Sequence, residues 1–206
     1  MSNSLSNSWK SSSTLTLDID TANVGDLLVV CLGIPQDDTQ ENSGSISCAN
    51  VSTWYEKEQD PSKIEQAGLS IWYGIVDATG PDIITISGEN SVPLGIWAGE
   101  FTASGTWSFD KGSRTSSSVH ATSGHFLSSA LSPTNTGELT VGVVTSSSAQ
   151  SSFTGSTSGY EYDTVSTSGF GMLVAYNLDA STSENPAWSA STLSYVSGAL
   201  CAFVAS

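Results

Sequence analysis

The chain has 206 residues, is rich in Ser, Thr and Gly, and carries a formal charge of −15. Twenty acidic residues against five basic ones cannot form the positive surface that binds phosphates, so we expect no nucleic-acid partner, and an anionic membrane would repel the protein. Ser and Thr compete for helical backbone hydrogen bonds and Gly is poor in helix interiors, so the composition favours strands and turns. A single all-β domain is expected at this length.

Residues 1–13 are interpreted as a Ser- and Asn-rich N-terminal arm, followed by a single β-sandwich domain at 14–206. Arms of this composition are usually disordered unless they dock on a neighbour. The N-terminus has no basic segment followed by an apolar run, so no secretory signal is expected. No apolar stretch approaches transmembrane length, so we expect no membrane partner.

Alternation of apolar and polar residues over 15–20 predicts the first half-buried strand. A continuous apolar run predicts a second strand at 27–34. Asp60-Pro61 has the signature of a helix start, which predicts a short helix at 62–67. Further strands of the first half are predicted at 69–75, 84–86 and 96–102.

The segment 111–124 is rich in Ser and Thr, and we interpret it as a connector between two halves. Residues 145–152 show no helical period and are predicted to form a polar loop. Strands of the second half are predicted at 139–144, 170–176 and 195–204. Many short strands separated by turn residues favour an antiparallel sandwich.

The stretch NVGDL at 23–27 recurs as NTGEL at 135–139, and a strand pattern follows each copy. Asn and Gly tolerate a positive φ, and the acid that follows is expected to hold the turn in solvent. Fainter matches occur in the same order, between 68–73 and 169–174 and between 99–104 and 200–206. Frequent Gly, Ser and Val can also produce weak repeats by composition alone.

These matches predict an internal two-fold duplication, with pseudo-repeats at about 14–110 and 126–206. A doubled unit would place two related sheets, or two related Greek keys, face to face. The predicted fold is therefore an antiparallel, jelly-roll-like β-sandwich.

Three cysteines, Cys31, Cys48 and Cys201, make an odd number, so at least one thiol is free or pairs between chains. Cys31 and Cys201 lie in apolar strand patterns and are interpreted as small buried hydrophobic residues. Nothing in their spacing indicates a disulfide framework.

Acidic residues were considered as catalytic groups, because a glycoside hydrolase needs two nearby carboxylates in a cleft. The pairs at 56–58 and 161–163 do not continue into a carboxylate series on one strand face, so we interpret them as solvated turn or edge acids. Glu100 is the acid most embedded in an apolar strand, and it is the candidate if the chain is an enzyme. The preferred interpretation of Glu100 is nevertheless the same, a solvated turn or edge acid, and no catalytic residue is assigned.

Metal binding was considered for two groups of residues. His120 and His125 are five residues apart, but no Cys or closely spaced acid completes a zinc site. Calcium could be bound by acidic loops, for which the candidates are Asp18, Asp20, Asp37 and Asp38. These acids lack EF-hand spacing and are interpreted as solvated, so no metal or cofactor is predicted.

Most of the tryptophans are expected to be core residues, among them Trp54, Trp72, Trp97, Trp107 and Trp188. Trp72 and Trp97 have apolar neighbours on both sides in the sequence. Strand residues alternate between two faces, so this pattern indicates a second buried surface, formed by another sheet or by another subunit.

Three segments, at 25–30, 70–73 and 99–101, resemble a widespread group of phage and prophage virion proteins that includes capsid decoration and tail-surface proteins. The resemblance implies a jelly-roll-like sandwich displayed in many copies on a virion, with other virion proteins and copies of itself as partners. It also implies a protein made in the host cytoplasm and located at the virion surface.

The leading hypothesis is therefore a noncatalytic structural virion protein, an oligomeric decoration or tail-surface subunit. The alternatives are a carbohydrate-binding module, which would have a glycan as partner, and a glycoside hydrolase. The same fold class hosts all three, so the fold alone does not choose among them.

Overall fold

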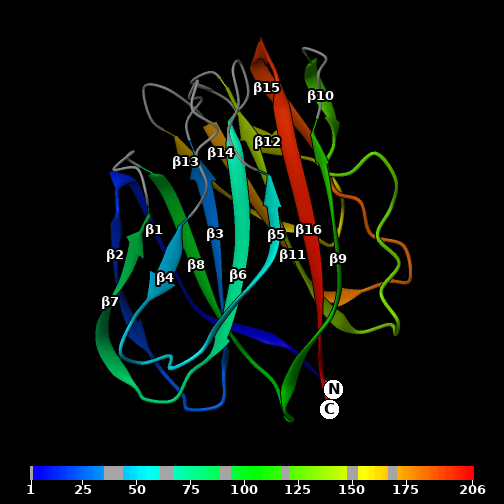
Figure 1. Ribbon diagram of the computed structural model, residues 1–206. Coiled ribbons are helices and arrows are strands. Elements are labelled where there is room, and N and C mark those ends of the chain that lie inside the picture. Colours follow the sequence, from blue (N-terminus) through cyan, green and yellow to red (C-terminus); the bar gives the residue numbers. More distant parts are fainter. Residues whose placement is uncertain are drawn as a thin grey trace.

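The computed structural model describes residues 2–34, 44–60, 67–88, 94–116, 121–147, 153–166 and 171–206. Within these ranges the chain forms sixteen strands and no helix (Figure 1). The predicted all-β class is therefore confirmed. Residues 62–66 of the predicted helix and 148–152 of the predicted loop lie outside the described residues. Residues 145 and 146, predicted to belong to that loop, instead end a strand.

The strands fall into two units of eight. The first unit comprises β1 (Ser4–Thr14), β2 (Thr16–Thr21), β3 (Leu27–Ile34), β4 (Ser45–Ser47), β5 (Trp54–Asp60), β6 (Gly68–Ile75), β7 (Gly80–Ser87) and β8 (Leu94–Thr102). The second comprises β9 (Trp107–Ser116), β10 (Ala121–His125), β11 (Glu138–Ser146), β12 (Thr154–Gly155), β13 (Glu161–Ser166), β14 (Gly171–Ala180), β15 (Ala187–Ser194) and β16 (Val196–Ala205).

Both units have the same sheet topology. The first contains a five-stranded sheet of order β1-β8-β3-β6-β5 and a three-stranded sheet of order β2-β7-β4. The second repeats this plan as β9-β16-β11-β14-β13 and β10-β15-β12. Each order is that of an antiparallel jelly roll, except that the fifth strand pairs with the sixth in the larger sheet. The chain is thus a tandem of two sandwich units.

Three hydrophobic cores separate the four sheets. One core lies between the two sheets of the first unit, and another lies between those of the second. The third and largest lies between the two five-stranded sheets and takes residues from both units. Figure 1 shows β2 and β7 of one outer sheet on the left and β10 of the other at the upper right, with β3 and β6 between them.

Residues of β3 are buried on both faces of the sheet. Leu27 and Val29 point into the core between the units, whereas Leu28 and Val30 point into the core of the first unit. A strand covered on both sides reads as a continuous apolar run, which explains the pattern at 27–34. The second buried surface predicted from the tryptophans is confirmed, and it is the other half of the same chain.

The two units are related by a pseudo-two-fold arrangement that extends to side-chain packing. Val29 pairs with Tyr73 across β3 and β6, and Val141 pairs with Tyr176 across β11 and β14. The Tyr73 ring meets the Phe203 ring edge-on, with centroids 5.3 Å apart at 66°. Tyr176 meets Phe101 in the same way, at 5.7 Å and 67°. Each unit therefore supplies the partner ring of the other, as in a symmetric dimer interface.

Charged residues at the sheet edges repeat the same symmetry. Lys10 on β1 forms an ion pair with Asp163 on β13. By strand register, the equivalents of these residues are Arg114 on β9 and Glu58 on β5. Burial raises the pKa of Glu58, and the charge of Arg114 acts against that shift. Both open sides of the central core are thus bordered by an opposite-charge pair between the units.

The repeated turn has the predicted backbone but not the predicted exposure. Gly25 and Gly137 both have positive φ, of 94° and 82°, a region that glycine adopts without a steric penalty. Asp26 and Glu138, expected in solvent, are only 4% and 2% exposed. This expectation was wrong, because each acid turns inward to accept hydrogen bonds within the turn.

The duplication has different boundaries from those predicted. Ser4–Thr14, interpreted as an arm, is an edge strand paired with β8 along its length. The expected connector at 111–124 instead contains most of β9, which pairs with β16, and β10. The second unit therefore starts near Trp107 and not near 126.

The predicted repeat matches hold with one change of register. Phe101 and Phe203 occupy equivalent positions, as the match of 99–104 to 200–206 predicted. The match of 68–73 to 169–174 is displaced by two residues, because Tyr73 is equivalent to Tyr176. A shift of two keeps every side chain on the same sheet face, so the sequence pattern could not reveal it.

Replacing Ile71 with Ala should destabilise the protein by about 2–5 kcal/mol, because Ile71 is fully buried in the core between the units. Ile83 is the matched control, since its side chain is 50% exposed on the outer strand β7. Ile83→Ala should change stability by no more than about 0.5 kcal/mol. Urea unfolding followed by tryptophan fluorescence measures both. Equal losses in the two variants would contradict the assignment of the central core.

Candidate functional site

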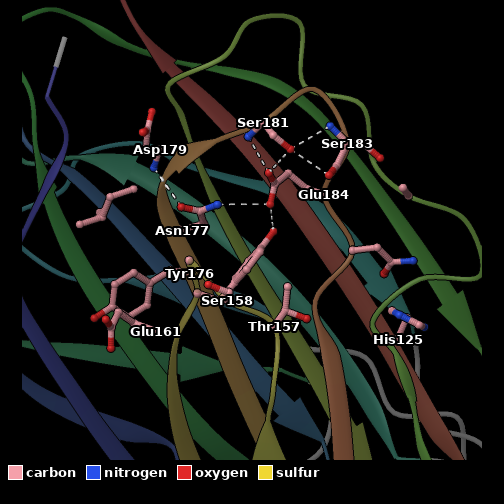
Figure 2. Close-up of a pocket in the computed structure, with 15 residues that line it drawn as sticks. His125, Thr157, Ser158, Glu161, Tyr176, Asn177, Asp179, Ser181, Ser183 and Glu184 are labelled. Carbon is pink, nitrogen blue, oxygen red and sulfur yellow. Dashed lines mark hydrogen bonds between the residues drawn. The ribbon is translucent and has the colours of Figure 1, made fainter.

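A cavity with a volume of about 780 Å³ lies in the second unit. Its walls come from the end of β10, the start of β13, the end of β14 and the loops on either side of them. Figure 2 shows Glu161 and Tyr176 on one side of the cavity and His125 on the other. The turn before β13 requires Gly159, whose φ is 86°.

Glu184 organises the upper wall of the cavity (Figure 2). One carboxylate oxygen accepts hydrogen bonds from the Ser181 backbone N–H at 2.6 Å and from the Ser181 hydroxyl at 2.7 Å. The other accepts a hydrogen bond from the Tyr160 hydroxyl and a longer one, of 3.4 Å, from the Asn177 amide. Burial raises the pKa of Tyr160, and the neighbouring Glu184 raises it further. Glu184 is therefore a structural acceptor, not an acid available to a ligand.

Asn185 and Thr157 fix the loops around this centre. The Asn185 side chain accepts from the Leu127 N–H at 2.9 Å and donates to the Leu127 carbonyl at 3.0 Å. Thr157 Oγ1 accepts the Ala187 N–H at 2.7 Å. These side chains replace backbone pairing where the strands end, so the cavity has a preorganised wall.

Glu161, Asp179 and the His125 ring are among the polar groups that line the cavity without a hydrogen bond to the described part of the chain. Tyr176 lies opposite Glu161 across the β13–β14 pair. Its ring packs against Trp97 and Phe101, and burial followed by the charges of Glu161 and Asp163 raises its pKa. The site thus offers two carboxylates, an imidazole and a fixed phenol to a polar ligand.

Glu100, the candidate from sequence, is fully buried on β8 and does not line this cavity. Its carboxylate accepts hydrogen bonds from the backbone of Ala22 at 2.8 Å and Asn23 at 3.2 Å, and from the Asn7 side chain at 3.1 Å. These bonds hold the turn between β2 and β3 against β1. The interpretation of Glu100 as a solvated acid was wrong, because these donors satisfy its carboxylate inside the protein.

The other sequence candidates are dispersed. Glu161 lines the cavity, whereas Asp163 accepts hydrogen bonds from Lys10 and from Trp97 Nε1. His125 lines the cavity, and His120 lies outside the described residues. Asp18 and Asp20 are exposed on β2, and Asp37 and Asp38 lie outside the described residues. Within the described ranges, no three His, Cys, Asp or Glu side chains gather as a metal site.

The aromatic and sulfur residues have mainly structural positions. Four tryptophans, Trp72, Trp97, Trp107 and Trp188, are core residues, as predicted, and Trp54 packs against the first-unit core. Cys31 and Cys201 are buried in the core between the units, where burial raises the pKa of both thiols. The interpretation of these two cysteines as small hydrophobic residues is confirmed.

Sequence reasoning missed Asp179, Glu184, Asn185 and Tyr160 as cavity residues. None of the four carries a local sequence motif. All four lie close to a loop at the end of a strand. Many residues of this chain have such a position, so it could not single them out.

The chain matches no known protein family, no curated protein and no solved structure. None of the described residues belongs to a helix with the length and apolar character needed to cross a membrane. Function must therefore be argued from the site and the architecture.

Replacing Tyr160 with Phe should destabilise the protein by about 1–3 kcal/mol, because the buried Glu184 carboxylate loses a donor. Tyr55 is the control, since it is 47% exposed and its hydroxyl makes no hydrogen bond to the described chain. Thermal unfolding of both variants at neutral pH measures the difference. If Tyr160→Phe is as stable as Tyr55→Phe, Glu184 does not depend on this hydroxyl.

Proposed function

We propose that the protein is a noncatalytic structural component of a virus particle, an oligomeric capsid decoration or tail-surface subunit. The observation that carries the proposal is the position of the residues that resemble virion proteins. The segments at 25–30, 70–73 and 99–101 come together on or at the start of β3, β6 and β8, adjacent strands of one five-stranded sheet. The resemblance therefore concerns the central architecture and not a loop or a pocket.

The distribution of charge supports a display role. Lys10 pairs with Asp163, Lys111 lies 3.8 Å from Asp110, and Arg114 interacts with Glu58. Lys57 lies over aromatic rings, with its Nζ 4.7 Å from the centre of the Phe109 ring. The described cations thus all face acids or rings of the same chain, which leaves an outer surface dominated by acids. Such a surface favours solubility and low nonspecific adhesion.

Size-exclusion chromatography with multi-angle light scattering tests this proposal over a series of protein concentrations. A stable mass that is a multiple of the 21.3 kDa chain is expected. A protein that stays monomeric at every concentration and is also retained on a glycan array would contradict it.

The second candidate function is carbohydrate binding, which the cavity of the second unit favours. Glu161, Asp179 and His125 are available to hydroxyl groups, and the volume of the cavity suits a small saccharide. The two aromatic rings among the described lining residues offer little open stacking surface, since Tyr160 is buried and Tyr176 packs against Trp97 and Phe101. This is why the structural role is placed first.

A glycan array with the wild-type protein and Asp179→Asn tests the second candidate. Binding through the cavity should weaken at least tenfold in the variant, because a carboxylate acceptor is lost. Asp18→Asn, an exposed substitution on β2, is the matched control and should bind like the wild type. Equal retention of both variants would place any glycan site elsewhere.

A further inference from the structure

The two copies of the repeated turn satisfy their buried acid in different ways. In the first unit, Asp26 Oδ2 accepts hydrogen bonds from the hydroxyls of Thr102 at 2.6 Å and Ser6 at 3.3 Å. It also accepts one from the Asn23 amide at 3.0 Å. All three groups can donate, so Asp26 Oδ2 is bonded without a proton of its own.

The strand registers identify the equivalent positions in the second unit. Ser6 is the extra residue where β1 shifts register against β8, between the pairs Leu5–Phe101 and Asn7–Glu100. Asp110 is the extra residue at the same shift of β9 against β16, between the pairs Phe109–Phe203 and Lys111–Ala202. By the same register, Thr102 corresponds to Val204. The second unit therefore lacks both hydroxyl donors: Val204 stands in place of Thr102, and the carboxylate of Asp110 stands in place of Ser6.

Glu138 consequently has one satisfied and one unsatisfied oxygen. Its Oε1 accepts hydrogen bonds from the Asn135 N–H at 2.8 Å and the Asn135 amide at 3.0 Å. Its Oε2 is buried and has no donor. Asp110 is bonded to Thr134, whose hydroxyl and N–H donate at 2.6 and 2.8 Å.

Few other charges act on this pair. Lys111 lies 3.8 Å from Asp110, and the Asp179 carboxylate lies beside Gly137 at the turn. Burial raises the pKa of Glu138; the two hydrogen bonds from Asn135 oppose this, Asp110 adds to it, and the net shift is upward. Partial burial raises the pKa of Asp110, but the hydrogen bonds from Thr134 and the charge of Lys111 lower it, and the net shift is downward. Two adjacent carboxylates with opposite shifts are the arrangement in which one carries the proton.

We infer that Glu138 and Asp110 share one proton, held on Glu138 Oε2 and donated to Asp110, so that the second-unit turn is a pH-sensitive element. The proton supplies the hydrogen bond that Ser6 supplies in the first unit. Because the pair is coupled, it titrates as a unit.

The sign of the effect follows from linkage. When folding raises the pKa of a carboxyl group, the protonated group stabilises the fold. This stabilisation is complete at pH values below the unfolded pKa, which is about 4.3 for Glu. That stabilisation is lost as pH rises through the raised folded value. Asp110 has the opposite sign, so its contribution is lost in acid. The turn is therefore most stable at mildly acidic pH, above the range where Asp110 becomes protonated and below the range where Glu138 loses its proton.

Thermal unfolding of Glu138→Gln from pH 4 to 8 tests the inference, since a Gln amide donates to Asp110 at every pH. At pH 8 the variant should unfold about 2–4 °C above the wild type, and the difference should shrink as pH falls. Asp26→Asn is the matched control at the equivalent turn, and it should unfold below the wild type because an amide cannot accept all three donors. If Glu138→Gln unfolds below the wild type at pH 8, as Asp26→Asn is expected to do, the inference is overturned.

Carboxyl-carbon NMR titration of the intact protein provides the second measurement. Glu138 should titrate above its ordinary value in the wild type and move back towards it in Asp110→Asn, whose amide can donate to a charged Glu138. Titration of Glu138 at or below about 4.3 in the wild type would overturn the proposal. The proposal would also be overturned if the two carboxylates bind a cation instead of a proton. In that case added calcium chloride would raise the melting temperature of the wild type but not that of Glu138→Gln.

Discussion

Between the two five-stranded sheets, side chains from both units form one apolar core, and this contact limits what the other strands can do. β3 and β11 lie at its centre and face each other. Because each five-stranded sheet also covers a three-stranded sheet, its central strands have no face in water. A polar substitution on either face would bury an unpaired group, which explains why these strands are nearly free of charge.

Freedom to vary is found away from this core. Tyr55 and Glu161 occupy equivalent positions: Tyr55 lies opposite Tyr73 in the first unit, and Glu161 lies opposite Tyr176 in the second. In the first unit Tyr55 stacks on Tyr73 at 5.1 Å, whereas in the second Glu161 faces the cavity. The same backbone position therefore closes an aromatic stack in one unit and lines a polar cavity in the other. Divergence of function between the repeats is expected at such edge positions.

The central strands could be predicted from sequence, and several edge strands could not. Leu27 to Ile34 is apolar throughout because both of its faces are covered. β1 and β9 are rich in polar residues because each is an edge strand with a solvated side, so most of their length lacks the hydrophobic period that marks a strand. This is why β1 was interpreted as an arm and why the second unit was placed too late in the chain.

The candidate site was harder to predict than the fold. Glu161 and His125 were noted for local spacing, but the cavity joins them to residues from three separate strands and loops. The buried Asp26 and Glu138 each accept a hydrogen bond from the Asn of their own turn, but their other neighbours come from far away in sequence. These are Ser6 on β1 and Thr102 on β8 for Asp26, and Asp110 on β9 for Glu138. No local pattern encodes such contacts, whereas the Gly25 and Gly137 backbone, which is local, was predicted correctly.

The pseudo-two-fold core has a consequence for how the molecule holds together. Two separate sandwich units joined by the same surface would come apart on dilution, because their association would depend on concentration. Here β8 leads into β9 through only a few residues, so the partner unit is always present at a high effective concentration. The joint between the units therefore belongs to the folding of one chain, and it persists however sparse the protein becomes.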